Sequence, residues 1–196
     1  MNRTLYSLGW GYVAICGLAL WLGSRRAPFG APATHGAAAP YSGPAGQWFA
    51  EMKPYCNALE VELSQQQRPA PATLEGAGYS AACYALAGRI DAARQVIDRL
   101  PGDERWRAAG IVFDVGHPVA DAGDDKSAGP IMELVVGYWP NHYMALYHAG
   151  MSEYILGQRD LARDHLRAFL ELYSNDDGWR RNAIEVLSRL GASPQQ

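Results

Sequence analysis

Residues 81–100 read AACYALAGRIDAARQVIDRL and residues 150–169 read GMSEYILGQRDLARDHLRAF, so small and apolar residues recur at the same offsets in both segments. A weaker copy, GHPVADAGDDKSAGPIMELV, lies between them at residues 116–135. Glycines stand at 88, 123 and 157, separated by 35 and 34 residues, and the following alanines at 93, 128 and 162 repeat both intervals. A period of about 34 residues is typical of stacked helix pairs. The sequence therefore predicts an all-α chain of helical hairpins.

This pattern resembles the tetratricopeptide repeat (TPR) family over roughly the central half of the chain. In that family a small residue lets two antiparallel helices approach, a glycine makes the turn, and an alanine starts the second helix. The resemblance implies a short α-solenoid, whose hairpins bury their apolar faces only by stacking on neighbours. The middle copy departs most from the family, because His117-Pro118 interrupts what should be helix. An architecture of this kind is suited to holding other molecules.

Composition limits the range of partners. With 196 residues, 48% of them hydrophobic, the chain can bury one domain-sized core. Its formal net charge is −3, and the predicted helices carry no stripe of Lys and Arg. Because binding to a phosphate backbone needs clustered basic side chains, we expect no nucleic acid partner.

The N-terminal segment, residues 5–23, reads LYSLGWGYVAICGLALWLG and has no charged side chain. Nineteen helical residues span about 28 Å, close to the roughly 30 Å hydrocarbon core of a bilayer. A cleaved signal peptide is the alternative, with residues 31–33 or 37–39 as cleavage sites. The apolar run is longer than a signal peptide usually has. We therefore favour one N-terminal transmembrane helix, an anchor over residues 1–26 that contacts membrane lipid through residues 5–23.

Small side chains recur along this anchor. They permit close approach of a second membrane helix, which makes integral membrane protein subunits the expected partners. The residues expected to pack in this way are Ser7, Gly11, Ala14, Ala19 and Gly23. No histidine occurs between Leu5 and Gly23, so this helix offers no axial ligand for a haem or chlorophyll, and we expect no cofactor of its own.

The rest of the chain divides into a linker and a helical domain. Residues 27–46 are rich in Pro, Ala and Gly and read as an extended tether. The domain, residues 47–196, opens with an amphipathic helix over 47–67 that Pro54 kinks or restarts. The apolar residues of that helix are Trp48, Phe49, Met52, Tyr55, Cys56, Leu59 and Leu63. Further helices are expected at 74–87, 91–100, 104–114, from about Pro130 onward, and at 141–156, 160–173 and 179–190.

Cys56 and Cys83 lie on helices that we expect side by side. A disulfide between them would close a loop of about 26 residues and add on the order of 3 kcal/mol to stability. Two buried free cysteines are the alternative explanation. Since a disulfide requires an oxidising compartment, a bridge here would favour a periplasmic location for the soluble part.

The middle repeat holds the one group of residues with metal-binding chemistry. His117, Asp121, Asp124 and Asp125 offer an imidazole and three carboxylates within nine residues, a set that suits a divalent cation. The spacing does not fit a calcium-binding hand. Turn and cap chemistry explains the same residues, because acidic groups stabilise the N-terminal end of a helix that opens near Pro130. We favour this second explanation and assign no metal.

Catalytic motifs are missing from the sequence. It contains no G-x-S-x-G, no Walker glycine loop, no C-x-x-C and no H-E-x-x-H. The remaining histidines are scattered, and an isolated histidine on a helix is more often packed or solvated than catalytic. They are His35, His142, His148 and His165. We therefore expect no catalytic residue and no enzyme activity.

The third repeat carries a second apolar stripe on its first helix. Its members are Met144, Tyr147, Met151 and Tyr154. In the TPR family these positions usually line the concave groove, and Met and Tyr make adaptable contact surfaces for a partner. The alternative, which we favour slightly, is that neighbouring helices cover the stripe and make it part of the core.

Three functions remain open. The first, which we favour, is a membrane-anchored scaffold or accessory subunit that stabilises a multi-subunit membrane complex. A photosynthetic reaction-centre or light-harvesting complex is one such host, although no residue singles it out. The second is an adaptor that recruits peptides or client proteins. The third is a metal-dependent enzyme that uses the loop at residues 117–125.

Overall fold

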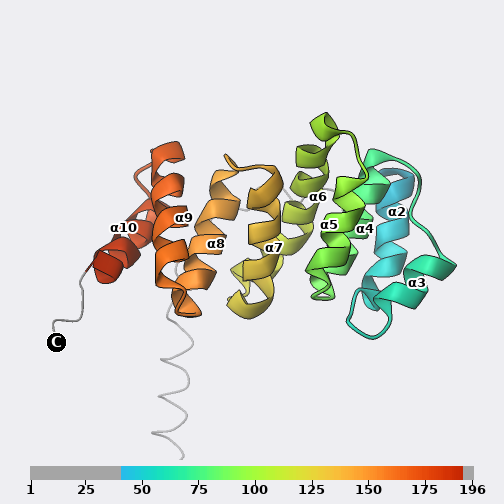
Figure 1. The fold of residues 1–196 in the computed structure, drawn as a ribbon, viewed down its shortest axis with the longest axis horizontal. Coiled ribbons are helices and arrows are strands. Elements are labelled where there is room, and N and C mark those ends of the chain that lie inside the picture. Colours follow the sequence, from blue (N-terminus) through green and yellow to red (C-terminus); the bar gives the residue numbers. More distant parts are fainter. Residues whose placement is uncertain (1–40, 192–196) are drawn as a thin grey trace, which may run out of the picture. The chain divides into compact units, whose positions relative to one another are not determined.

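The computed structural model describes residues 41–191, which form nine α-helices and one short 3-10 helix and contain no strand (Figure 1). The elements follow in the order α2 (Gly43–Met52), η1 (Lys53–Tyr55), α3 (Val61–Gln67), α4 (Leu74–Leu86), α5 (Ile90–Asp98), α6 (Gly102–Asp121), α7 (Asp125–Tyr138), α8 (Tyr143–Ile155), α9 (Arg159–Leu172) and α10 (Gly178–Gly191). The all-α prediction is confirmed for these residues, and their arrangement is that of a helical-repeat fold.

The hairpins α4–α5, α6–α7 and α8–α9 turn in the same way. Gly88, Gly123 and Gly157 have φ angles of +71°, +76° and +81°, a region that residues with a Cβ avoid. The backbone N–H of the residue after each glycine donates to the carbonyl five residues earlier, at 2.9, 3.3 and 2.8 Å respectively. This bond is characteristic of a Schellman motif. The interval seen in the sequence is therefore a repeat of structure.

Small residues lie where the two helices of each hairpin meet. A Cβ added to Gly116 would lie 2.6 Å from Ile131 Cγ2, and one added to Gly150 would lie 2.7 Å from Leu166 Cγ. The first hairpin has the fully buried Ala81 at the equivalent position. The alanines of the second helices are also fully buried, namely Ala93, Ala128 and Ala162.

The hairpins stack on one another to form the core. Helix α4 packs against α5 and α6, α7 packs against α6 and α8, and α8, α9 and α10 pack together. One apolar cluster runs from α2 to α8 and includes Phe49, Ile97 and Met132. A second cluster, which includes Phe169 and Val186, lies between α8, α9 and α10. The last helix thus covers the end of the stack.

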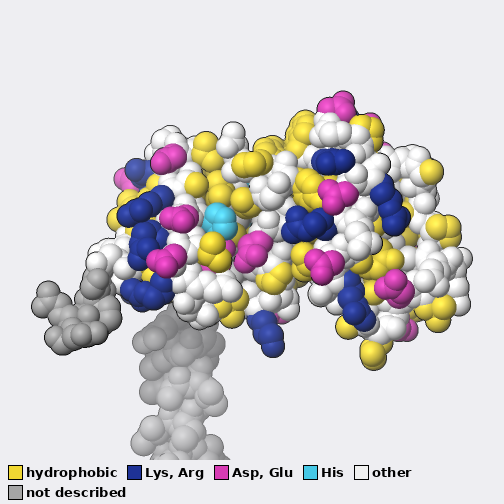
Figure 2. Space-filling view, in the orientation of Figure 1, with side chains coloured by type: hydrophobic (Ala, Val, Ile, Leu, Met, Phe, Trp, Pro, Cys, Tyr) yellow, Lys and Arg dark blue, Asp and Glu magenta, His cyan; other side chains and the backbone are white. Residues whose placement is uncertain are grey.

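The charged surface is mixed in sign. On the face drawn in Figure 2, Lys and Arg side chains alternate with Asp and Glu side chains, including over α9 and α10. Arg163, for example, lies 2.7 Å from Asp160 on the same helix. The absence of a nucleic acid partner stays a prediction.

Several expectations fall outside the described residues. They concern the anchor and its contact with lipid, the part of the linker before residue 41, and the packing residues Ser7, Gly11, Ala14, Ala19 and Gly23. Within residues 41–191, none of the helices combines the length and hydrophobicity needed to cross a bilayer.

The first helical segment differs from the prediction. Helix α2 begins at Gly43, inside the expected linker, and the chain from there to Gln67 forms three short elements rather than one helix. Pro54 lacks an N–H and lies in η1, where α2 has ended. The side chain of Asn57 accepts bonds from the N–H groups of Leu59 and Glu60 and forms a turn. Leu59 and Leu63, which belong to the apolar set of the predicted amphipathic helix, are 93% and 59% exposed.

The middle hairpin also differs. His117-Pro118 does not stop the preceding helix, because α6 continues to Asp121 with Pro118 inside it. Pro118 has no N–H to donate and its ring crowds the carbonyl one turn earlier. Helix α6 accommodates both effects, and the N–H of Ala122 still reaches the Pro118 carbonyl at 3.1 Å. Helix α7 then begins at Asp125 rather than near Pro130, with Asp124 as its cap.

Cys56 and Cys83 form a disulfide with a sequence separation of 27. The bridge ties the loop after η1 to α4, where Cys83 is fully buried. The structure therefore has the disulfide, and not the two buried free cysteines that were the alternative.

Removing the disulfide is expected to destabilise the domain by about 3–4 kcal/mol, because the unfolded chain then gains the entropy of an open loop. The variant is Cys56→Ser with Cys83→Ala, and the measurement is urea denaturation. Cys16→Ser, which leaves the bridge intact, is the control. Equal unfolding midpoints for the two variants would contradict the bridge's stabilising role.

The close contact at Gly150 predicts that Gly150→Ala costs about 1–3 kcal/mol, since the new methyl group would overlap Leu166. Gly178→Ala is the matched control, because a Cβ there meets nothing within 4 Å. Urea denaturation of both variants gives the comparison. A Gly150→Ala protein as stable as the control would show that the helices separate at no cost.

Candidate metal centre

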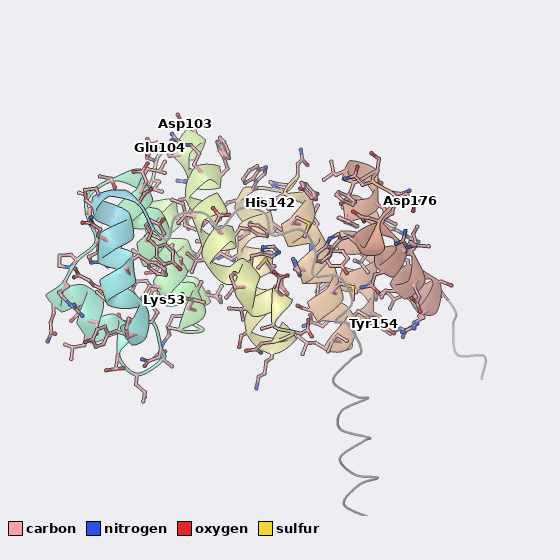
Figure 3. All side chains as sticks on the ribbon, turned by 180° about the vertical axis from the view of Figure 1, so that it is seen from behind. Lys53, Asp103, Glu104, His142, Tyr154 and Asp176 are labelled. Atoms are coloured by element: carbon pink, nitrogen blue, oxygen red, sulfur yellow. A yellow bond between two sulfur atoms is a disulfide. The ribbon has the colours of Figure 1, made fainter. Side chains whose placement is uncertain are left out.

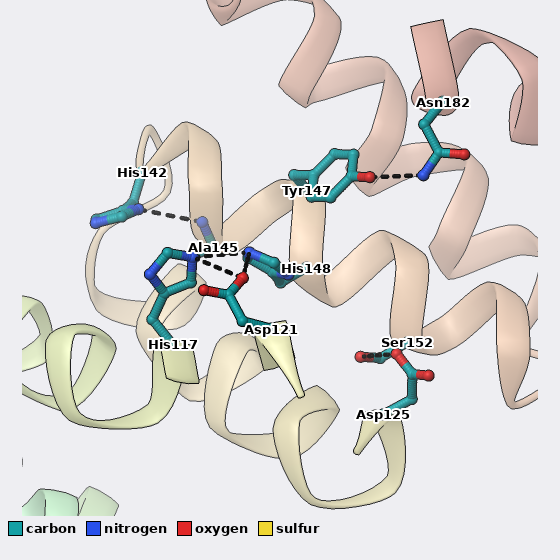
Figure 4. Close-up of polar contacts among 9 residues, drawn as sticks. All are labelled: His117, Asp121, Asp125, His142, Ala145, Tyr147, His148, Ser152 and Asn182. Atoms are coloured by element: carbon teal, nitrogen blue, oxygen red, sulfur yellow. Dashed lines mark hydrogen bonds and ion pairs between the residues drawn. The ribbon is translucent and has the colours of Figure 1, made fainter. Parts of the chain in front are cut away.

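Three side chains with metal-ligand chemistry converge between α6 and α8: His117, Asp121 and His148 (Figure 4). His117 and Asp121 lie one turn apart on the same face of α6, which is possible only because α6 continues through Pro118. His148 comes from the middle of α8. Of the four residues proposed from the sequence, His117 and Asp121 belong to this cluster. Its third member, His148, was not assigned to any site from the sequence.

The distances among the three groups are short. The Nε2 atoms of His117 and His148 are 3.0 Å apart. The Asp121 Oδ1 atom lies 3.4 Å from His117 Nε2 and 3.8 Å from His148 Nε2. All three ligand atoms therefore lie within one small region of space.

Neighbouring rings hold both imidazoles. The Phe113 ring stacks on that of His117 at a centroid distance of 4.8 Å and an angle of 22°. Trp179, from α10, meets His148 edge to face at 5.6 Å. The side-chain amide of Asn182 donates to the Tyr147 hydroxyl at 2.7 Å and so joins α10 to α8 beside the site.

Burial controls the charge of His148, whose side chain is 7% exposed. Burial lowers the pKa of His148 to about 4, with a further lowering from His117 and an opposing effect of Asp121. Its imidazole is therefore neutral at physiological pH, which is the form that binds a metal.

Asp124 and Asp125 do not join the cluster. The Asp124 carboxylate caps α7 by accepting the N–H of Ser127 at 3.2 Å. The Ser152 hydroxyl donates to Asp125 at 3.1 Å. Asp124 thus has the cap chemistry that the sequence suggested for the whole loop, whereas Asp125 joins α7 to α8.

A pocket of about 220 Å³ borders two of the three groups, Asp121 and His148. Met151 of α8 and Trp179 of α10 also line it. A small molecule or a water can therefore reach the cluster from this side.

The apolar stripe of α8 is largely covered. Tyr147 is buried, and its ring packs against Phe169 and Trp179 at 5.1 and 4.9 Å. Met144 packs partly buried against the first core cluster, and Met151 and Tyr154 pack partly buried against the second. Tyr154 lies near the C-terminal end of α8 and His142 just before its start (Figure 3). Tyr147 is thus a core residue, and the other three keep only part of their surface exposed.

A second buried polar pair joins α8 to α9. Glu153 is 1% exposed, and its two carboxylate oxygens lie 2.8 and 2.9 Å from His165 Nδ1. This hydrogen bond raises the pKa of His165; burial opposes the shift, and the charges of Glu153, Glu133 and Asp164 add to it. The pair fixes the third hairpin and lies outside the metal cluster.

Comparison with known proteins gave no match to a family model, a curated sequence or a solved structure.

His165 makes stability depend on pH. Its folded-state pKa is raised above the unfolded value of about 6.5, so protonated His165 stabilises the fold fully below that pH, and the contribution is lost as pH rises through the raised pKa. We expect His165→Gln to cost about 1–2 kcal/mol near pH 6 and less in alkaline solution. Urea denaturation across this range, for both proteins, measures the difference. A difference that stays constant with pH would contradict the assignment.

Proposed function

We propose that this chain is a non-enzymatic, membrane-anchored, TPR-like scaffold subunit that stabilises a multi-subunit membrane complex. The observation that carries the proposal is an aromatic stripe along the edge of the stack at which α6 and α8 begin and α9 ends. Its members are Trp106, Trp139, His142, Tyr143 and Tyr173.

The aromatic stripe is continuous and partly open to solvent. Trp106 meets Trp139 at 5.0 Å, Trp139 meets His142 at 4.6 Å, and Tyr143 stacks on Tyr173 at 5.3 Å. Trp106 and Tyr143 remain 45% and 43% exposed. Aromatic side chains are enriched at protein interfaces and dominate their binding energy. A partner protein that covers the stripe would bury rings already held in place by their neighbours.

The hairpin geometry supports the TPR-like assignment. A small residue at the helix crossing, a turn glycine and a buried alanine recur in all three hairpins. In a solenoid each repeat contacts only its neighbours, which leaves a long face free for binding.

Two further features bear on where the partner lies. The Cys56–Cys83 disulfide favours an oxidising compartment such as the periplasm. The uncharged residues 5–23 favour a membrane anchor, so integral membrane protein subunits are the proposed partners. A photosynthetic reaction-centre or light-harvesting complex stays a candidate host.

Peptide recruitment is a second candidate, favoured by a groove of about 830 Å³ beside the first hairpin. The loop with Pro69 and Pro71 lines one side of it, and Tyr84 of α4 and Leu100 line the other. An extended segment fits such a groove, and peptide capture there would be weakened by Tyr84→Ala and unaffected by changes in the aromatic stripe.

The scaffold proposal predicts that the full-length chain co-purifies with membrane subunits in fixed stoichiometry from detergent extracts. Trp106→Ala combined with Tyr143→Ala should lower recovery of the complex at least about tenfold, since each lost interface aromatic commonly costs more than 1 kcal/mol. Native mass spectrometry gives the stoichiometry.

Tyr55→Ala combined with Leu59→Ala is the matched control, because both residues are exposed and lie outside the aromatic stripe. It should leave recovery unchanged. A chain that runs alone, without a stoichiometric partner, would refute the scaffold proposal.

A further inference from the structure

We propose that His117, Asp121 and His148 form a binding site for a divalent transition-metal ion that cross-links the second and third hairpins. The site goes beyond the scaffold function and does not depend on it.

Geometry is the first argument. The three ligand atoms form a triangle with edges of 3.0, 3.4 and 3.8 Å. One point at the centre of such a triangle lies about 2.0 Å from all three corners, which matches Zn–N and Zn–O distances of about 2.0–2.2 Å. No side chain therefore has to move far to coordinate an ion.

Ligand type selects the class of metal. Two imidazoles and one carboxylate suit Zn²⁺, Cu²⁺ and Ni²⁺, whereas Ca²⁺ and Mg²⁺ prefer sites built from oxygen alone. The expected order of affinity places Cu²⁺ above Zn²⁺ and Ni²⁺.

The two imidazoles present the same ring atom to each other. The two Nε2 atoms face each other, so a hydrogen bond between them requires that one ring carries its proton on Nε2. When a metal binds, that ring would carry its proton on Nδ1 instead, which leaves both Nε2 lone pairs free for the ion.

The pocket beside the cluster leaves a further coordination position open. Three protein ligands with an exchangeable fourth position are typical of accessible zinc sites. Asp121 and His148 both line the pocket, so a water or a small anionic ligand held in it would complete the coordination.

A metal at this point would join α6 directly to α8. In the polypeptide these two helices belong to successive hairpins and are connected through α7. Because an ion that binds only the folded state stabilises it by mass action, metal binding should raise the unfolding temperature.

The test uses the full-length chain in detergent, with any purification tag removed and metals stripped by a chelator. Isothermal titration with Zn²⁺ should show one ion per chain, and the unfolding temperature should rise with Zn²⁺ concentration. Titration with Co²⁺ should give the visible absorption of a nitrogen- and oxygen-ligated ion.

His117→Gln and Asp121→Asn are the informative variants, because these side chains are 30% and 52% exposed and their replacement keeps their approximate size. Each should weaken Zn²⁺ binding at least about tenfold and abolish the thermal shift. His165→Gln is the matched control, because it removes a half-buried histidine that is bonded to Glu153, outside the cluster. It should bind Zn²⁺ as the unaltered chain does.

Two results would overturn the proposal. The first is a chain that shows neither heat of binding nor thermal shift at millimolar Zn²⁺. The second is equal Zn²⁺ affinity in His117→Gln, Asp121→Asn and His165→Gln, which would place the bound ion on other residues. Circular dichroism of each variant separates loss of the site from loss of the fold.

Discussion

The closeness of the two helices in each hairpin is the constraint on which the rest of the structure depends. Gly116 and Gly150 leave no room for a methyl group against the facing helix. That contact fixes the distance between the two helices of a hairpin. Stacking of the hairpins then buries the apolar faces that a single hairpin would expose. The relative positions of α6 and α8 follow from the stacking, and with them the meeting of His117, Asp121 and His148.

The sequence predicted the hairpins well because their determinants are local. Each turn has a glycine with positive φ and, five residues later, a buried alanine. This short pattern recurs with the glycines at 88, 123 and 157. It predicted the segment before residue 68 poorly. Leu59 and Leu63 have helical spacing, but Pro54 and the turn at Asn57 take the chain out of a continuous helix, and tertiary packing leaves both leucines exposed.

The candidate site could be predicted only in part, because its residues come from two hairpins. His117 and Asp121 are four residues apart, and that spacing was visible once the helix was known to continue through Pro118. His148 lies 31 residues beyond His117, and its ring reaches the cluster only through the stacking of α8 on α7. Spacing along the chain does not show which face of α8 turns toward α6. The only signal for the site in the sequence was that His117 and His148 fall on the first helices of adjacent repeats.

The position of the disulfide also decides how the domain would carry mechanical load. A pull on the chain at residue 41 would unwind α2 and η1 and then reach Cys56, where the covalent bridge passes the force directly to Cys83 within α4. Residues 57–82, including all of α3, would bear no tension. Extension from that end would therefore stop after a short stretch, and the force on the stacked hairpins beyond it would enter through the last turn of α4.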